Sequence, residues 1–246
     1  NPLDGVTTEG NLIKPGFESF VGLDPLPSRH GLTIGEIARY LQSRRGVECE
    51  LEVLPMRGWR REMVFEETGL PWVYPSPNMP TVDTALVYPG LCLVEATELS
   101  EGRGTCKPFE VAGAPGVDPE ALAAALTERN LTGCRFRPLY FRPLFQKHAG
   151  KTCGGVQIHV TDRRKFDSVM TGLTFLQCVK QVTPEAFAWR AKPYEFVDEI
   201  PAIDLLAGDD QLRLTLDAAG DLAELAERWL QERIVFETVR QEAFLY

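Results

Sequence analysis

The stretch "GGVQIHVTDRRKFDSVMTGLTFLQCVKQV", residues 154–182, decides the fold class. In its first part the apolar residues Val156, Ile158 and Val160 alternate with polar ones, which is typical of a strand with one buried face. From Arg163 to Val182 the apolar side chains recur at helical spacing instead. A strand followed directly by a helix is a βα unit, so we predict an α/β protein.

Two other segments carry helix start signals. Thr33 and Glu36 form a capping box ahead of a helix that Gly46 can end. Asp221 and Glu224 form another before the last apolar helix, whose buried face we expect to include Leu222, Leu225 and Trp229.

Two more segments have the pattern of strands. "VECELEVLP", residues 47–55, alternates and predicts a half-buried strand. "TALVYPGLCLVEAT", residues 84–97, is an apolar run that predicts a buried strand broken at Pro89 and Gly90. Between them the Pro-rich residues 57–84 predict an irregular segment.

The composition changes near residue 113. Asp118 is an N-cap residue and Pro119 suits the first helical position, so an Ala- and Leu-rich helix is expected to run to about Asn130. We therefore predict two domains, residues 1–112 and residues 113–246.

The charge composition argues against nucleic acid as a binding partner. Lys and Arg total 26 against 35 Asp and Glu, a formal charge of -9, and no basic run follows the pattern of nucleic-acid binding. No segment approaches the roughly 20 apolar residues of a membrane span. Three scattered histidines and six cysteines without a C-x-x-C pair predict no metal site, and we expect most of the cysteines to be small buried residues.

The loop "ELSEGRGTCKPFE", residues 98–110, sets Arg103 between two glycines. It fits neither the dinucleotide nor the P-loop pattern. Ser100, Arg103 and Thr105 offer donors for a hydroxyl-rich, anionic ligand, and the alternative is a tight turn in which the glycines only permit positive φ.

Carboxylates surround this loop at Glu95, Glu101 and Glu110. Glycoside hydrolysis needs two carboxyl groups about 5 to 9.5 Å apart, a separation that sequence does not give. A carboxylate beside Arg103 would be held in its charged form, which suits a base or an orienting group better than a proton donor.

Several irregular segments together resemble the bacterial exo-β-N-acetylmuramidase family, the NamZ or YbbC-like proteins. They are "NPLDG", "FVGLDPLPSRHGLTIGEIA", "GLPWVYPSPNMPTVDTALVYPG", "EATELSEGRGTCKPFE", "FQKHAGKTCGGVQIHVTD" and "PYEFVDEIPAIDLLAGDD". The resemblance implies the C-terminal portion of a Rossmann-like domain followed by a smaller α/β domain, with the active site in the cleft between them. It also implies release of N-acetylmuramic acid from the non-reducing end of peptidoglycan fragments, without a cofactor.

The resemblance assigns roles to particular residues. Glu95 and Glu101 become candidate catalytic carboxylates. The residues expected to line the cleft and bind substrate are Asn1, Arg29, His30, Asn78, Tyr88, Thr97, Ser100, Arg103, Thr105 and His148. Family members also carry an upstream stretch with a Glu-His-Gly segment, so we expect this chain to lack an N-terminal part of the same protein.

Two positions depart from the family pattern. Asp4 and Ala96 stand where glycine is usual, so the backbone at both turns is expected to differ. The leading hypothesis is a glycosidase of the cell envelope, periplasmic or secreted, with a cytoplasmic location open. The alternatives are a non-catalytic module that binds cell-wall saccharide and an α/β protein that binds phosphate or nucleotide.

Overall fold

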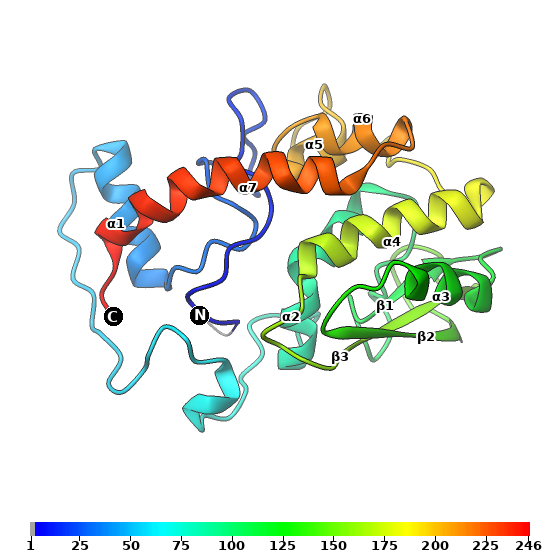
Figure 1. The fold of residues 1–246 in the computed structure, drawn as a ribbon, viewed down its shortest axis with the longest axis horizontal. Coiled ribbons are helices and arrows are strands. Elements are labelled where there is room, and N and C mark those ends of the chain that lie inside the picture. Colours follow the sequence, from blue (N-terminus) through cyan, green and yellow to red (C-terminus); the bar gives the residue numbers. More distant parts are fainter. Residues whose placement is uncertain (1–2) are drawn as a thin grey trace.

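The protein is built around a small antiparallel sheet, seen in a computed structural model that describes residues 3–246 (Figure 1). The strands β1 (Val111–Ala114), β2 (Cys134–Phe141) and β3 (Cys153–Val160) lie in the order β1-β3-β2. Val111 of β1 pairs with Gln157, and Cys134 of β2 pairs with Val160. The predicted strand at residues 154–160 is thus confirmed as the central strand, and the coarse α/β class is confirmed with it.

Helices α2 (Val82–Leu91), α3 (Pro119–Glu128) and α4 (Ser168–Val182) build the main core together with the sheet. Helices α2 and α4 approach each other closely through Gly90 and Gly172. A Cβ at Gly90 would lie 1.8 Å from the carbonyl oxygen of Ser168, so no larger residue fits there. Glycine at this crossing lets the two backbones touch.

The two ends of the chain come together at a second, smaller core. Helix α1 (Ile34–Arg45) follows the N-terminal loops, and the long helix α7 (Leu222–Val239) extends from the side of α5 (Ala202–Ala207) and α6 (Gln211–Asp217) back to α1 (Figure 1). The buried residues of this core are Leu32, Tyr40, Phe236 and Ala243. The last helix therefore ties the N-terminal segment to the rest of the molecule.

The capping residues in the sequence predicted the starts of three helices correctly. The Thr33 and Glu36 capping box and the left-handed Gly46 bound α1 as expected, and Asp118 caps α3. Asp221 caps α7 by accepting from the backbone N–H of Ala223. Helix α4 begins at Ser168, five residues after the predicted start, because the side chain of Asp167 caps it there.

The predicted strand at residues 84–97 is wrong. These residues form α2 and the 3-10 helix η2 (Cys92–Ala96). A uniformly apolar run has no period that separates a buried strand from a buried helix. On either side of Pro89 the Ser168 hydroxyl accepts from the N–H of Gly90 at 3.0 Å and donates to the carbonyl of Val87 at 2.9 Å.

The predicted strand at residues 47–55 is also wrong. The segment is irregular, and all of it is exposed except the half-buried Val53. Within the described part of the chain no neighbouring strand pairs with it, and an alternating pattern cannot form a sheet without a partner for its backbone groups. The segment from residue 57 to residue 81 is irregular as predicted, apart from the 3-10 helix η1 (Phe65–Thr68).

The packing of the chain shows no domain boundary after residue 112, where the sequence predicted one. The boundary after residue 112 falls inside β1, and the main core takes residues from both sides of it. Residues 3–81 hold one α-helix, one 3-10 helix and, among described residues, only isolated bridges such as Glu9 with Arg29. No helix within residues 3–246 is long and apolar enough to cross a membrane.

Candidate functional site

Glu95, Glu101, Arg103, Lys147 and Tyr194 meet at the end of η2, and we call this group the carboxylate cluster. The Arg103 guanidinium donates to Glu95 Oε1 through Nη2 at 2.6 Å, and its Nε lies 3.4 Å from Glu101 Oε1. Both carboxylates thus lie against one guanidinium. The predicted pair of carboxylates is therefore brought together.

The Gly-Arg-Gly turn sets the direction of Arg103. Gly102 and Gly104 have φ of 78° and 83°, and a Cβ at either would lie within 2.5 Å of a backbone oxygen, of Val111 or of Phe145. The Arg103 guanidinium lies 4.9 Å from the centre of the Phe109 ring. Burial alone would lower the pKa of Arg103, but the hydrogen bond and charge of Glu95 and the charge of Glu101 outweigh it and raise the pKa.

The hydroxyl groups of the loop are used inside the turn. Ser100 Oγ accepts from the N–H of Gly102 at 3.2 Å, and Thr105 Oγ1 donates to the carbonyl of Gly102 at 2.6 Å. Thr97 Oγ1 donates to the carbonyl of Val94 at 2.8 Å. These contacts fit the tight-turn alternative, and substrate binding by the three hydroxyls stays a prediction.

Lys147 is a member of the cluster that sequence reasoning missed. Its Nζ donates to the carbonyls of Val94 and Leu99 at 3.0 Å and of Glu95 at 3.2 Å, and lies 3.1 Å from Glu101 Oε2. Burial lowers the pKa of Lys147 more than the charge of Glu101 raises it. Its position next to His148 in "QKHAGK" was the available signal.

Tyr194 is the second member that was missed. Its hydroxyl donates to Glu95 Oε2 at 3.2 Å, so both Glu95 oxygens have a donor. Burial, followed by the charge of Glu95, raises the pKa of Tyr194, which keeps the phenol a hydrogen-bond donor. The segment "PYEF" that carries it is part of one of the stretches that resemble the family.

Two more predicted residues lie near the cluster. His148 Nε2 lies 2.7 Å from the carbonyl oxygen of Glu98, and its backbone has a φ of 58°. The Tyr88 ring packs edge-on against Phe109 at 4.8 Å, and Tyr88 remains 36% exposed. Glu110 faces elsewhere, since it accepts from Thr81 and Thr84 at the start of α2 and pairs with Lys107.

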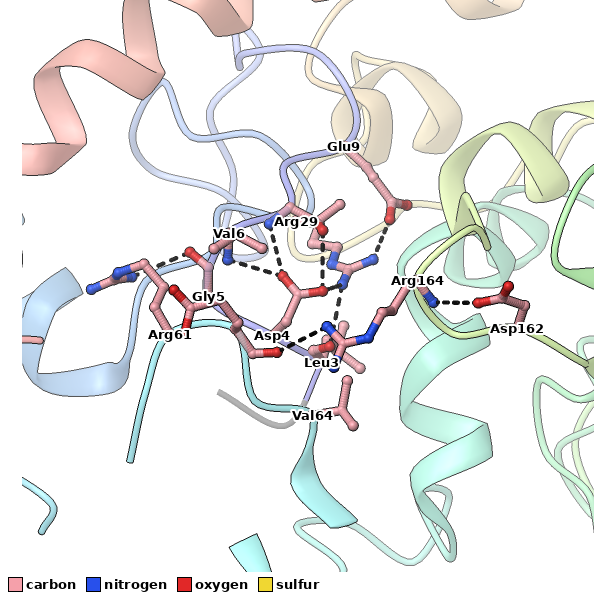
Figure 2. A network of polar contacts seen from close by, with 12 residues as sticks. Leu3, Asp4, Gly5, Val6, Glu9, Arg29, Arg61, Val64, Asp162 and Arg164 are labelled. Carbon is pink, nitrogen blue, oxygen red and sulfur yellow. Dashed lines mark hydrogen bonds and ion pairs between the residues drawn. The ribbon is translucent and has the colours of Figure 1, made fainter. Parts of the chain in front are cut away.

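Arg29 belongs to a different group, the Arg29 cluster of Asp4, Glu9 and Arg29 (Figure 2). Its Nη2 lies 2.7 Å from Asp4 Oδ2, and its Nη1 contacts Glu9. The side chains of Arg29, Asp4 and Glu9 are only 3%, 7% and 4% exposed. Glu9 also accepts from the N–H of Val169 at 3.0 Å, so the cluster joins the N-terminal segment to α4.

Asp4, one of the two departures from the family pattern, has a φ of 146°. Glycine adopts such a conformation without strain, whereas a residue with a Cβ needs compensation. The Asp4 carboxylate supplies it by accepting from the N–H groups of Val6 at 2.9 Å and Thr7 at 2.7 Å. The side chain thus holds a turn that glycine would form without contacts.

Two other predicted residues, His30 and Asn78, have contacts away from the carboxylate cluster. His30 Nδ1 accepts from the N–H of Leu32, and burial, aided by Arg240, lowers the pKa of His30 to about 4. His30 lines a cavity of about 640 Å³ between the N-terminal loops and α1. Asn78 is half-buried in the irregular segment, and Asn1 lies outside the described residues.

The described residues offer little to a metal. Across residues 3–246 no group of three or more His, Cys, Asp or Glu side chains could hold an ion. Of the six free cysteines Cys153 and Cys178 are buried, while Cys49 and Cys106 are exposed. Cys49 is exposed because its segment does not form the predicted strand.

Comparisons with known proteins cover the whole chain. It is 39% identical over 246 residues to the peptidoglycan β-N-acetylmuramidase NamZ of Bacillus subtilis and spans 58% of that protein's length. Two crystal structures of DUF1343 family proteins from Bacteroides fragilis superpose over 100% of this chain and 64% of their own, with TM-scores of 0.89 at 29% identity and 0.74 at 24% identity.

The family comparison divides the chain in two. Residues 1–83 match the N-terminal region, and residues 86–246 the C-terminal region, of the family described as exo-β-N-acetylmuramidase NamZ. This division falls at the start of α2 rather than after residue 112. With both matches and the solved structures in agreement, the chain belongs to the NamZ family of exo-β-N-acetylmuramidases.

Proposed function

We propose that the protein is a glycoside hydrolase that releases N-acetylmuramic acid from the non-reducing end of peptidoglycan fragments, in cell-wall turnover. The observation that carries the proposal is the match over all 246 residues to the Bacillus subtilis enzyme, because the matched region includes the loop with the paired carboxylates. The chain spans 58% of that relative, so its activity is inferred from the part that aligns.

The carboxylate cluster supplies part of the required chemistry. Glu95, with a side chain 17% exposed, is the carboxylate that solvent or a sugar can reach, while the Glu101 side chain is 5% exposed. Glu95 pairs with Arg103, and Glu101 pairs with Arg103 and Lys147, so we propose a base or an orienting role for each of them. A separate carboxylic acid is then needed to protonate the leaving oxygen.

Arg103 is the proposed contact for the substrate's own charge. Muramic acid carries a lactyl carboxylate, and an arginine can hold such a group through charge-assisted hydrogen bonds. The Nε and Nη2 atoms of Arg103 serve Glu101 and Glu95, and Nη1 takes part in neither pair. The Arg103 side chain is 25% exposed, so this third nitrogen is the one for the lactyl group.

Two further proposals concern the location of the enzyme and its fold. Peptidoglycan fragments arise at the cell envelope, so we place the enzyme there, periplasmic or secreted. For the fold, we propose that residues 3–83 belong to a Rossmann-like domain. The match of residues 1–83 to the N-terminal region of the family supports this assignment.

The test is hydrolysis of a chromogenic N-acetylmuramic acid β-glycoside by the protein, beside the matching N-acetylglucosamine glycoside. We expect turnover of the first and little of the second. Arg103→Ala should remove this discrimination, while Arg135→Ala, at an exposed position on β2, should leave it unchanged. Binding without turnover would contradict the proposal and indicate a saccharide-binding module, and equal loss on both substrates would contradict the lactyl contact.

A further inference from the structure

Lys147 reaches the carboxylate cluster from a distant part of the chain. It lies in the loop between β2 and β3, 53 residues from the carbonyl of Val94. An ammonium group has three donors and no acceptor. Lys147 directs them at the carbonyls of Val94, Glu95 and Leu99, which frame the segment that carries Glu95.

The charge of Lys147 also serves Glu101. Glu101 Oε2 is buried and lacks a hydrogen bond of good geometry, and Lys147 Nζ lies 3.1 Å away as an ion pair. A buried carboxylate oxygen without a compensating charge is costly. One side chain therefore fixes the backbone on either side of Glu95 and offsets the charge of Glu101.

The loop that carries Lys147 is held in place by other contacts as well. The N–H of Leu144 donates to the carbonyl of Gly104 at 2.9 Å, and His148 contacts the carbonyl of Glu98. Loss of the Lys147 ammonium should therefore leave the loop attached, and Arg103 still lies beside Glu101 to offset part of its charge. What it removes is the alignment of the segment from Val94 to Glu101.

We propose that Lys147 is a positioning residue, which holds Glu95 and Glu101 in the arrangement that the reaction requires. This proposal rests on the proposed function and deepens it. It states that a side chain outside the loop of residues 98–110 sets the geometry of both carboxylates. Lys147 itself need not touch the substrate. Its contacts are to three backbone carbonyls and one carboxylate.

The test compares Lys147→Met and Lys147→Arg with Lys151→Met, a matched control at an exposed lysine of the same loop. Misplacement of a catalytic group by about 1 Å can cost a factor of about 100. We expect Lys147→Met to lower kcat on the N-acetylmuramic acid β-glycoside by about 10- to 100-fold with KM within about threefold. Lys147→Arg should recover part of the loss, because it restores the charge but not the three-carbonyl pattern.

Three kinetic outcomes would overturn the proposal. The first is a kcat of Lys147→Met within about twofold of that of Lys151→Met, and the second is a rise in the KM of Lys147→Met with its kcat unchanged. The third is an equal loss of kcat in Lys147→Met and Lys147→Arg.

Amide hydrogen exchange separates this proposal from the proposed function. In Lys147→Met the amides of residues 95–101 should exchange at least about tenfold faster than in the wild type, with other segments unchanged. If the wild type hydrolyses none of the glycosides, the proposed function fails and the exchange rates alone decide the positioning role. Unchanged protection of residues 95–101 would overturn it.

Discussion

The Arg29 cluster and the carboxylate cluster have the same composition, one arginine between two carboxylates, and opposite exposure. The Arg29 side chain is 3% exposed, and those of its partners are 7% and 4% exposed. The Arg103 side chain is 25% exposed, and that of Glu95 is 17% exposed. The first is sealed between the N-terminal segment and α4, whereas the second opens to solvent.

The difference shows that residue type alone does not mark a binding site. Arg29 was expected to line the cleft, but its guanidinium pairs with Asp4 and Glu9, and its side chain is only 3% exposed. The carboxylate cluster also contains Lys147, which lies beside Glu101, and Tyr194, which donates to Glu95. Both carboxylates are thus oriented, while Glu95 and Arg103 remain partly exposed. We therefore propose a structural role for the Arg29 cluster and a catalytic role for the carboxylate cluster.

The largest effect on stability should follow Arg29→Met. At about pH 8, where Glu9 is ionised, the substitution leaves the buried carboxylates of Asp4 and Glu9 without their cation, and breaking a buried pair in this way costs about 3 to 5 kcal/mol. Denaturant unfolding measures the loss, with the exposed Arg135→Met as the control. A loss below about 1 kcal/mol would show that the cluster is not a structural joint.

Arg103→Ala should lower activity strongly and stability only slightly. We expect kcat/KM on the N-acetylmuramic acid β-glycoside to fall about 100-fold, since the substitution removes a charge-assisted contact and the orientation of Glu95. Stability should fall by only about 1 kcal/mol, because the pair is partly exposed. The comparison breaks down if Arg103→Ala unfolds the protein as severely as Arg29→Met does.

The pH dependence of stability should distinguish the two clusters. Burial raises the pKa of Glu9 to about 7, because the charge of Arg29 only partly offsets the burial and the charge of Asp167 adds to the rise. The neutral form is the favoured one in the folded state, so the stability linked to Glu9 is full below pH 4.5 and is lost as the pH rises through about 7.

Glu9→Gln removes this titration. The midpoint of thermal unfolding of the variant should gain on that of the wild type between pH 4.5 and pH 7 and then stay parallel to it. Glu95→Gln, in the carboxylate cluster, serves as the matched control. A constant difference between Glu9→Gln and the wild type over this range would contradict the assignment.

The smallest effect on activity should come from Tyr194→Phe. This substitution removes one of the two donors to Glu95 and leaves Arg103 in place. A hydrogen bond to a charged group contributes about 1.5 to 3 kcal/mol at most, and the partly exposed Glu95 can replace the lost donor with water. We expect kcat to fall about three- to tenfold with KM nearly unchanged. A loss as large as that of Arg103→Ala would mean that Tyr194 itself contacts the substrate.

Sequence reasoning succeeded where the signal is local. The capping box at Thr33, the cap at Asp118 and the alternation of residues 154–160 depend on neighbouring residues only, and all three were predicted correctly. The strand expected at residues 47–55 failed because strand formation also requires a partner, which no local pattern reveals.

The candidate site could be predicted in part for the same reason. Glu95, Glu101 and Arg103 lie within nine residues of one another, so their meeting follows from one loop. Lys147 and Tyr194 lie 52 and 99 residues after Glu95, and no spacing rule connects them to that loop. Burial of Arg29 could not be read from the sequence either, because it depends on where α4 packs.

The most direct test of the central claim is kcat/KM of Glu95→Gln on the chromogenic N-acetylmuramic acid β-glycoside, measured beside its unfolding midpoint. Glutamine keeps the shape of the side chain and removes its charge. If Glu95 in the carboxylate cluster performs the chemistry, activity should fall at least about 100-fold while the midpoint stays close to that of the wild type. Activity within about twofold of the wild type would contradict the account and place the reaction elsewhere in the protein.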